Sequence, residues 1–512
     1  MKKFLAFSLA SIIGLTACAG GGNGGSAVNP GANPSGSEIG AEATPLADFS
    51  NDIGGEITVY TFDSMLTGPF LEEAAQMFMY KHPDTVINIE TFSSMPEVRR
   101  AEGTEGAAIM VATQGDMSAE RRDYINMVNT ELMSGRGPDI LALDVLPFHE
   151  YARNGFLVNL REFMYADSNF DINDYRVNIF EALNSDLGQF IFPVDYAFRY
   201  VAYGTELIDL EPGGIFSFEN LIELGQQRGS AAGADSEANL FNMSIGPARG
   251  LFQEMFTQNY GYFVDLNNRQ ANFNTGTFAD MLNLLIYLEQ NGYVQQRASA
   301  PEAGAVRTPE MMLNMMNEEA YFRVRQSAML INEFQQHGDG IRGGMQIVVG
   351  AGDMVGSENS EIAGILGNEH GEVPFTVHQG FGINSNSQNQ HTAWEFIKFL
   401  SSEAVRQSMR MRGLPTHIEA FEERAMLSIT GELFSAEFGG QVREMDATDQ
   451  EALADYIAKV EYFTNQLNTF LTVDTMIEDI VLTEVREFFD GSRNAEDVAQ
   501  TLQSRIHLFL NE

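Results

Sequence analysis

The first third of the chain carries two hydrophobic patterns in turn, and each pattern predicts a different element. Residues 56–62 alternate apolar and polar side chains and are rich in β-formers, so they predict a strand. Residues 69–80 instead place Phe70, Ala74 and Phe78 at helical spacing, which predicts a helix with one buried face. The alternation continues with strands at 86–92 and 139–143 and with helices at 118–133 and 149–163, the last of them broken near Gly155. Strands that alternate with helices imply a parallel sheet with right-handed crossovers.

The rest of the chain keeps this alternation, so the sequence predicts the α/β fold class throughout. We expect further helices at 218–227, 277–290, 392–400, 474–489 and 494–510, and further strands at 199–203, 327–331 and 377–384. The chain has 512 residues, of which 44% are hydrophobic and 11% aromatic, and this composition is typical of a globular protein. At ~150 residues per domain, we expect about two or three domains with ordinary hydrophobic cores.

The N-terminus has the three parts of an export signal. Two lysines precede an apolar run at 4–15, which two small residues follow. Cys18 comes directly afterwards and is the only cysteine, and this arrangement resembles the lipobox of a bacterial lipoprotein. We therefore expect residues 1–17 to be removed and the Cys18 thiol to carry lipid that anchors the protein at the extracellular face of the cell membrane. An ordinary secretory signal that happens to contain a cysteine is the alternative.

Residues 18–55 are rich in Gly, Ser, Ala, Asn and Pro, so we expect a flexible linker between the lipid anchor and the folded part. The apolar run before Cys18 is well short of the ~20 residues that a bilayer crossing needs. The formal net charge of the chain is −41, which repels nucleic acid and anionic lipid headgroups. The composition therefore excludes nucleic acid as a partner and leaves the lipid anchor as the expected contact with the membrane.

Six short segments carry motifs in a characteristic order and spacing. They are Phe70–Pro83, Ser134–Ile140, Asn154–Leu160, Ala328–Asn332, Gly382–Leu400 and Gly413–Thr416. The stretch from Gly382 to Leu400 is the most specific, with Gly-Ile-Asn-Ser-Asn-Ser at its start and Ala-Trp-Glu-Phe-Ile-Lys-Phe-Leu at its end. Together these segments resemble family 1 of the extracellular solute-binding proteins, which are the receptors of bacterial ABC importers.

The resemblance implies a two-lobed fold like that of the type II periplasmic binding proteins. Each lobe would be discontinuous: residues 56–193 plus 381–413 in lobe 1, and residues 194–380 plus 414–512 in lobe 2. The crossings near Pro193, Gly380 and Leu414 would form a hinge, and the solute would bind between the lobes. The resemblance further implies a monomer that uses no cofactor and delivers its solute to the permease subunits of an ABC importer.

Candidate ligand contacts follow from the chemistry of a neutral polar solute. Aromatic faces can cover the apolar faces of a sugar ring, and carboxylates or amides can accept its hydroxyl hydrogens. We expect such side chains at strand ends and in the loops between lobes, and the candidates are Phe62, Asp63, Ser64, Asp144, Asp195, Tyr196, Phe334 and Phe381. For each of them, a capped loop or a core aromatic is the alternative. The only tryptophan, Trp394, has core-like spacing on its helix, so stacking would have to use tyrosine or phenylalanine.

Common catalytic and metal-binding motifs are missing from the sequence. It contains no His-Glu-x-x-His pair, no Gly-x-Ser-x-Gly elbow and no phosphate-binding Gly-Lys-Ser/Thr loop. We therefore expect a carbohydrate receptor of an importer, without a metal site and without enzymatic activity. A receptor for a non-sugar solute such as a peptide stays open as an alternative. A secreted glycan hydrolase also stays open, because 71 acidic residues make some carboxylate pair inevitable.

Overall fold

The computed structural model of the protein describes residues 53–93, 97–99, 111–113, 117–205, 208–232, 239–241, 248–294, 320–331, 360–433, 435, 442 and 444–511. The predicted signal segment 1–17, the predicted lipid attachment at Cys18 and the candidate ligand residue Phe334 lie outside these residues. Most of the predicted linker 18–55 lies outside them as well. All described residues belong to one compact unit, Pro45–Glu512.

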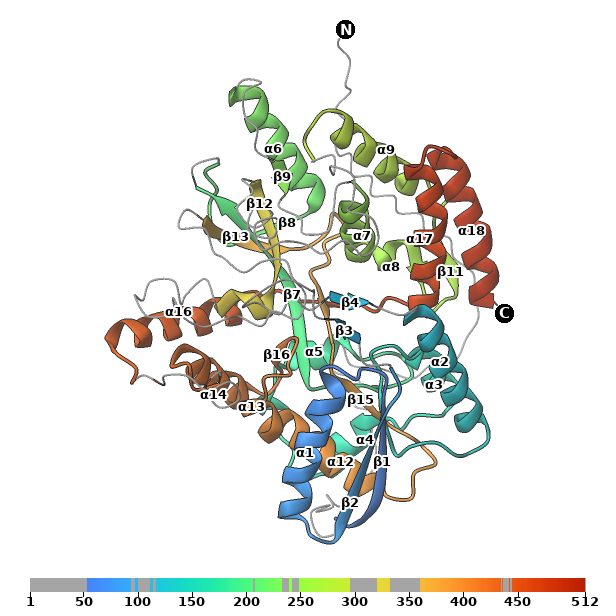
Figure 1. Cartoon of the computed structure of the whole chain (residues 1–512), viewed down its shortest axis with the longest axis vertical. Coiled ribbons are helices and arrows are strands. Elements are labelled where there is room, and N and C mark those ends of the chain that lie inside the picture. The colour runs from blue at the N-terminus through green and yellow to red at the C-terminus, as the bar shows by residue number, and fades with distance from the viewer. Residues whose placement is uncertain are drawn as a thin grey trace, which may run out of the picture. The chain divides into compact units, whose positions relative to one another are not determined.

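The first sheet has five strands in the order β2-β1-β5-β15-β6 (Figure 1). Its strands are β1 Gly55–Thr61, β2 Thr85–Thr91, β5 Ile140–Ala142, β6 Phe192–Pro193 and β15 Gly380–Ile383. β1 pairs in parallel with both β2 and β5, which confirms the parallel sheet predicted for the first third of the chain. β15 comes from much later in the sequence and lies antiparallel between β5 and β6. The carboxyl ends of β1 and β5 therefore meet at one edge of this sheet.

Helices and short turns surround the first sheet. They are α1 Thr67–Lys81, α2 Met117–Met133, α3 Phe148–Arg153, α4 Leu160–Ala166, η2 Ile172–Asp174, α5 Val177–Ala182, α12 Gln390–Phe399, η4 Leu400–Ala404 and α13 Val405–Gln407. The predicted break near Gly155 is present, because Gly155 has a left-handed φ of 71° between α3 and α4. Trp394 of α12 is fully buried, and its indole Nε1 donates to Asp167 Oδ2 at 2.9 Å. The predicted core role of Trp394 is thereby confirmed.

The second sheet has eight strands, and the long strand β7 Asp195–Gly204 is its centre. The other strands are β8 Gly214–Phe216, β9 Asn239–Phe241, β12 Ala320–Gln326, β13 Ser360–Leu366, β14 Pro374–Thr376, β16 Leu414–Pro415 and β17 Thr469–Phe470. β12, β13, β14 and β16 all pair antiparallel with β7. Two hairpins stand apart from both sheets: β3 Glu97–Arg99 with β4 Val111–Thr113, and β10 Val264–Asp265 with β11 Gln270–Ala271.

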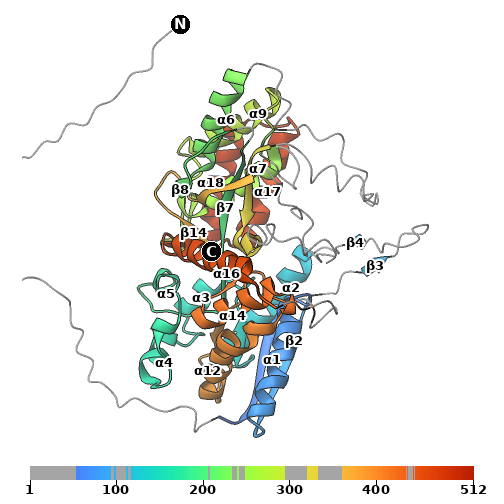
Figure 2. The same ribbon diagram turned by 90° about the vertical axis from the view of Figure 1, so that its left-hand side faces the viewer.

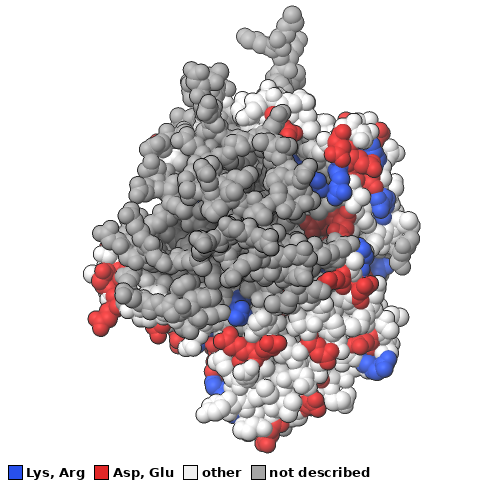
Figure 3. All heavy atoms as spheres, in the orientation of Figure 1, with Lys and Arg blue, Asp and Glu red and all other residues white. Residues whose placement is uncertain are grey.

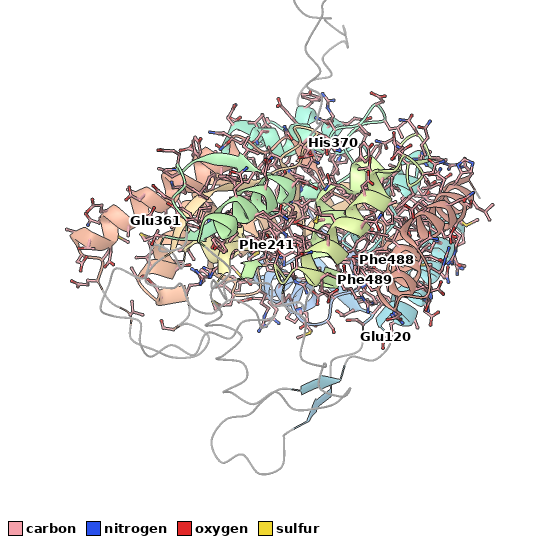
Figure 4. The ribbon with its side chains drawn as sticks, turned by 90° about the horizontal axis from the view of Figure 1, so that it is seen from above. Glu120, Phe241, Glu361, His370, Phe488 and Phe489 are labelled. Atoms are coloured by element: carbon pink, nitrogen blue, oxygen red, sulfur yellow. The ribbon has the colours of Figure 1, made fainter. Side chains whose placement is uncertain are left out.

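The remaining helices include the two that close the chain. The set is α6 Phe218–Ala232, α7 Ala248–Gln258, α8 Tyr260–Phe263, α9 Thr277–Gln290, α14 Ile418–Ile429, α16 Ala447–Thr464, α17 Thr475–Phe489 and α18 Ala495–Asn511. α17 and α18 run side by side (Figures 1 and 2). Phe488 and Phe489 near the end of α17 (Figure 4) are in edge-to-face contact, with ring centroids 5.3 Å apart. These residues join a large core cluster with α7 and α9.

The predicted strand at 327–331 is wrong. Ser327–Met329 form a 3-10 turn, η3, and the strand ends one residue earlier at Gln326. The backbone N–H of Phe198 donates to Ser327 Oγ at 3.2 Å, so a side chain takes the place of the next hydrogen bond between strands. The predicted strand at 377–384 is also shorter than expected, because β15 covers Gly380–Ile383 alone.

The chain passes between the two sheets at points close to those predicted. It runs from β6 into β7 after Pro193, returns between β14 and β15 before Gly380, and enters β16 at Leu414. The lobe boundaries inferred from the resemblance remain a prediction, since the described residues form a single compact unit.

The described surface is acidic, in keeping with the net charge of −41. On the face that Figure 3 draws, the described surface shows more acidic than basic side chains. Within the described part of the chain, no helix combines the length and the apolar character that a membrane crossing requires.

Candidate functional site

Two adjoining cavities lie between elements of the first sheet and elements of the second. The larger cavity has a volume of about 580 Å³. Its first wall consists of residues from α2, α3 and the loop after β5: Arg122, Ile125, Asn126, Asn129, Leu143, Asp144, Val145, Leu146, Pro147, Phe148, His149, Glu150 and Asn154. Its second wall consists of Leu266, Arg269, Thr472, Val473, Asp474, Thr475, Met476, Phe509 and Leu510. The two walls therefore come from segments that are far apart in the sequence.

The smaller cavity has a volume of about 250 Å³ and is lined by residues from α5, α8 and β17 among other segments. Four residues line both cavities, namely Phe148, His149, Leu266 and Thr472. The two cavities are consequently neighbours that share part of their lining. Their combined size lies within the range of ordinary small-molecule sites.

Asp144 stands where β5 ends, at the sheet edge where β1 also ends. Its side chain is open to the larger cavity. Surrounding protein and, secondly, the Asp63 carboxylate raise the pKa of Asp144 to about 6, although the nearby Arg412 guanidinium favours the charged form. Asp144 is therefore an ionised acceptor at neutral pH, within reach of protonation under mildly acidic conditions.

His149 of α3 supplies an uncharged polar group to both cavities. Burial and, secondly, the neighbouring Arg153 lower the pKa of His149 to about 4. The imidazole is therefore neutral at pH 7 and has one nitrogen that donates and one that accepts.

Two contacts join α3 to the β10–β11 hairpin across the cavities. Arg153 Nη2 donates to the carbonyl oxygen of Leu266 at 3.0 Å, and Arg269 Nη2 lies 3.2 Å from Glu150 Oε2. Arg269 has a left-handed φ of 54°, the one such non-glycine residue in the part of the chain that is described. These contacts hold the first and second walls against each other at one end of the larger cavity.

Two buried polar atoms of the cavity lining have no hydrogen-bond partner among the described residues. They are Thr472 Oγ1, on both cavities, and Gln258 Nε2, on the smaller one. Gln258 is only 5% exposed. Because buried polar groups are almost always hydrogen-bonded, such atoms beside a cavity point to a polar ligand or bound water.

Of the candidate ligand residues that the structure describes, Asp144 is the one that lines either of these two cavities, and Asp63 and Ser64 lie near it at the same sheet edge. Asp63 pairs with Arg412 at 2.8 Å, and its carboxylate also accepts from the backbone N–H of Met65 at 2.8 Å. The Ser64 hydroxyl accepts from Ser93 Oγ at 2.8 Å. The structure thus brings three predicted polar residues together, and Asp63 and Ser64 use their side chains for contacts within the protein.

The predicted aromatic residues and Asp195 lie deeper. Phe62 is 4% exposed and packs on Tyr124 with ring centroids 5.6 Å apart. Asp195, Tyr196 and Phe381 have no exposed surface. None of these four lines either cavity, so their direct contact with a ligand stays a prediction, as does that of Phe334, which is outside the described residues.

Asp195 has a clear structural task at the crossings between the sheets. Its Oδ1 accepts the backbone N–H groups of His378 and Gln379 at 2.9 and 2.8 Å. Asp195 opens β7 and the two N–H groups precede β15, so one carboxylate joins two crossings. Gly413 lies against its other oxygen, and a Cβ at that position would approach within 2.8 Å.

Of the eight candidate residues, one belongs to the first wall and none to the second, so sequence reasoning missed the whole second wall and the first wall apart from Asp144. Thr472 and Phe509 were not among the candidates, although Phe509 belongs to the helix predicted at 494–510. The available signal was the apolar stripe of that helix, which continues to its last turn. Among the described residues, no group of three or more His, Cys, Asp and Glu side chains could hold a metal ion.

Comparison with solved structures places this fold among known proteins. An ABC substrate-binding protein of Listeria monocytogenes, solved with cycloalternan, matches with 17% identity over 90% of this chain and 99% of that chain, at a TM-score of 0.51. A family 1 extracellular solute-binding protein of Alicyclobacillus acidocaldarius matches with 13% identity over 90% and 99%, at 0.54. A cyclic alpha-maltosyl-1,6-maltose binding protein of Arthrobacter globiformis matches with 14% identity over 89% and 99%, at 0.50. These matches confirm the predicted two-lobed binding-protein fold.

The sequence itself supplies the family. No curated protein matches it. The profile of the bacterial extracellular solute-binding protein family matches residues 120–407, more than half of the chain. The matched region contains the α3 side of the larger cavity and β15 of the first sheet. The chain belongs to the bacterial extracellular solute-binding protein family.

Proposed function

We propose that the protein is the extracellular receptor of an ABC importer and that it captures a carbohydrate in the two adjoining cavities. The observation that carries this proposal is the make-up of the larger cavity. It combines three carboxyl groups, two arginines, three carboxamides and hydroxyl groups with phenylalanine side chains, and this combination suits a ligand with many hydroxyl groups and apolar ring faces.

Each group has a definite part in such binding. Asp144 accepts hydrogen bonds from sugar hydroxyls, and the amides of Asn126, Asn129 and Asn154 can both donate and accept. Neutral His149 and the Thr472 hydroxyl add polar contacts without adding net charge. Two structural relatives point to the same ligand class: the Listeria monocytogenes protein was solved with cycloalternan, and the Arthrobacter globiformis protein is a cyclic alpha-maltosyl-1,6-maltose binding protein.

The transport step follows from the two-walled arrangement. Solute binds between the walls, the two lobes close around it, and the closed form docks on the permease subunits, whose partner ATPase drives import. The protein acts as a monomer that binds without transforming its ligand. Cys18 holds it at the extracellular face of the membrane through lipid, and residues 19–55 act as the tether.

A thermal-shift screen with oligosaccharides, peptides and polyols tests the proposal. A ligand present at 100 times its Kd adds ~2.7 kcal/mol to the free energy of unfolding, which is a clear shift. We expect carbohydrates to shift the melting temperature and to be recovered intact by chromatography. A shift with peptides but with no carbohydrate would contradict the carbohydrate ligand, and release of new reducing ends would identify a hydrolase.

The anchor is tested separately by Cys18→Ser. We expect this variant to leave the cells and appear in the medium, with unchanged carbohydrate affinity, because the lining of both cavities begins only at Arg122, far along the chain from Cys18. Retention of the variant on the cells would contradict lipid anchoring. Cells that express the wild-type chain provide the matched control.

A further inference from the structure

The last helix carries an apolar stripe that is longer than the core it covers. Val498, Leu502 and Ile506 of α18 lie on one face and are fully buried in the core cluster shared with α9 and α17. The same face continues for one more turn to Phe509 and Leu510. These two residues line the larger cavity, whereas Leu508 points away and does not line it.

The final turn of α18 is held in place by hydrogen bonds. Asn511 Nδ2 donates to the carbonyl oxygen of His507 at 2.8 Å and to that of Arg269 at 3.3 Å. Arg269 in turn contacts Glu150 on the first wall. Phe509 is therefore presented to the cavity by a helix end that is attached to the β10–β11 hairpin.

Phe509 is unusually open for a residue on an apolar stripe. It is 36% exposed, whereas Phe148, the other phenylalanine of the larger cavity, is 9% exposed. An aromatic ring left in water gives up a large part of the hydrophobic stabilisation that its burial would supply. Trp394 is fully buried, so it offers no ring to the cavity. Phe509 is the open aromatic face on this cavity's described lining.

We propose that Phe509 is a ligand-binding residue whose ring stacks on the apolar face of a sugar ring in the larger cavity. The inference rests on the proposed carbohydrate function and deepens it, because it assigns the stacking role to the C-terminal turn of the chain. The polar groups of the first wall, Asp144 among them, then meet the hydroxyl rim of the same sugar. The ligand class that this arrangement selects is a neutral saccharide with at least one ring face formed by C–H groups.

The test compares four variants with the carbohydrate that gives the largest melting shift with the wild-type protein. We expect Phe509→Ala to weaken binding about tenfold, since an aromatic contact plus its buried area is of that size. Phe509→Tyr and Phe509→Trp should bind within about threefold of the wild type, because both keep a stacking face. Leu508→Ala is the matched control: Leu508 is 59% exposed on the same turn, lies outside the cavity lining, and should leave affinity unchanged.

Phe509→Trp adds a second readout. Because Trp394 is buried, the new indole is the tryptophan that a bound sugar can touch, so we expect its fluorescence to change on titration. A merely structural role of Phe509 would lower the melting temperature of the ligand-free Phe509→Ala variant and leave the Phe509→Trp signal flat.

The outcomes separate this inference from the proposed function. If the wild type binds carbohydrate and Phe509→Ala behaves like Leu508→Ala, stacking by Phe509 is refuted while the carbohydrate function stands. If the wild type binds only peptides or polyols, the carbohydrate function fails and the inference fails with it.

Discussion

The two walls of the larger cavity differ in what they offer a ligand. All the carboxamides of the cavity come from the first wall, whereas the second wall contributes Leu266, Val473, Met476, Phe509 and Leu510 together with a few polar groups. The first wall therefore offers the carboxamides beside six apolar residues, whereas the second offers five apolar residues of nine and no carboxamide. A ligand that has both hydroxyl groups and an apolar face is complementary to the two walls together.

The carboxylates of the two walls show the contrast most clearly. Asp474 of the second wall is the N-cap of α17, and its Oδ1 accepts from the backbone N–H groups of Met476 and Ile477 at 2.9 and 3.1 Å. Asp144 of the first wall caps no helix and is open to the cavity. Of two similar side chains on one cavity, Asp474 is thus used by a helix cap, and Asp144 is the one that we propose for ligand recognition.

The largest effect that we predict is a loss of carbohydrate affinity, and it is expected for one of two variants in which these carboxylates are separately replaced by alanine. Asp144→Ala should weaken carbohydrate binding about 30-fold, because hydrogen bonds to a charged acceptor contribute about 1.5–3 kcal/mol. Asp474→Ala should instead lower the free energy of unfolding by about 1 kcal/mol through loss of the cap, with affinity changed by about twofold or less. Isothermal titration and urea denaturation of both variants check the pair. Equal losses of affinity would remove the proposed division between the walls.

A pH series sharpens the role of Asp144 without removing the side chain. The pKa of Asp144 is raised to about 6, mainly by the desolvating protein around the cavity and then by Asp63, so the folded protein takes up this proton more readily than the unfolded chain. The stability of the ligand-free wild type should therefore rise, relative to Asp144→Asn, as the pH falls from 7 to 5, while carbohydrate affinity falls over the same window.

Denaturant midpoints and titrations at pH 5, 6 and 7 check this prediction. Other groups with a raised pKa, such as Glu254, titrate in both proteins, so the difference between wild type and Asp144→Asn isolates the one carboxyl. A difference that does not change between pH 5 and 7 would show that Asp144 titrates normally.

The first wall was the more predictable of the two, and the reason is physical. Asp144 follows a buried strand whose neighbours are close in sequence, and parallel strands must end at the same edge of the sheet. Local pattern and one topological rule were therefore enough to place it near Asp63. Asp195 also lies at a strand end, where the sequence predicted ligand contacts. Its carboxylate instead accepts hydrogen bonds from N–H groups that lie 183 and 184 residues further along the chain.

The second wall could not be derived in the same way. Periodicity predicted the helix at 494–510 and its apolar face, but it did not say where the helix core ends or what the last turn faces. Thr472 lies just after the two-residue strand β17, which is too short to leave a pattern. The strand predicted at 327–331 failed for a related reason, because a hydrogen bond from Phe198 to the Ser327 hydroxyl ends the ladder early.

A smaller effect is expected from removing the Thr472 hydroxyl on the second wall. Thr472→Val keeps the shape of the side chain but removes the hydroxyl, whose oxygen has no partner among the described residues. We expect carbohydrate affinity to fall about fivefold, the size of one neutral hydrogen bond, while the ligand-free protein becomes no less stable. Calorimetry and thermal melts of the variant check both parts. A destabilised variant with unchanged affinity would mean that Thr472 serves the fold alone.

The smallest predicted effect concerns the pair that joins the walls, Glu150 and Arg269. Both side chains are about half exposed, at 44% and 43%, and exposed pairs contribute roughly 0.2–1 kcal/mol. Arg269→Gln should therefore weaken carbohydrate binding by about twofold at low ionic strength, because closure brings the walls together more weakly. In about 1 M salt, where charges are screened over a few ångströms, the variant and the wild type should bind alike. A loss of affinity that persists in high salt would mean that Arg269 touches the ligand directly, so that the second wall would also supply a charged contact.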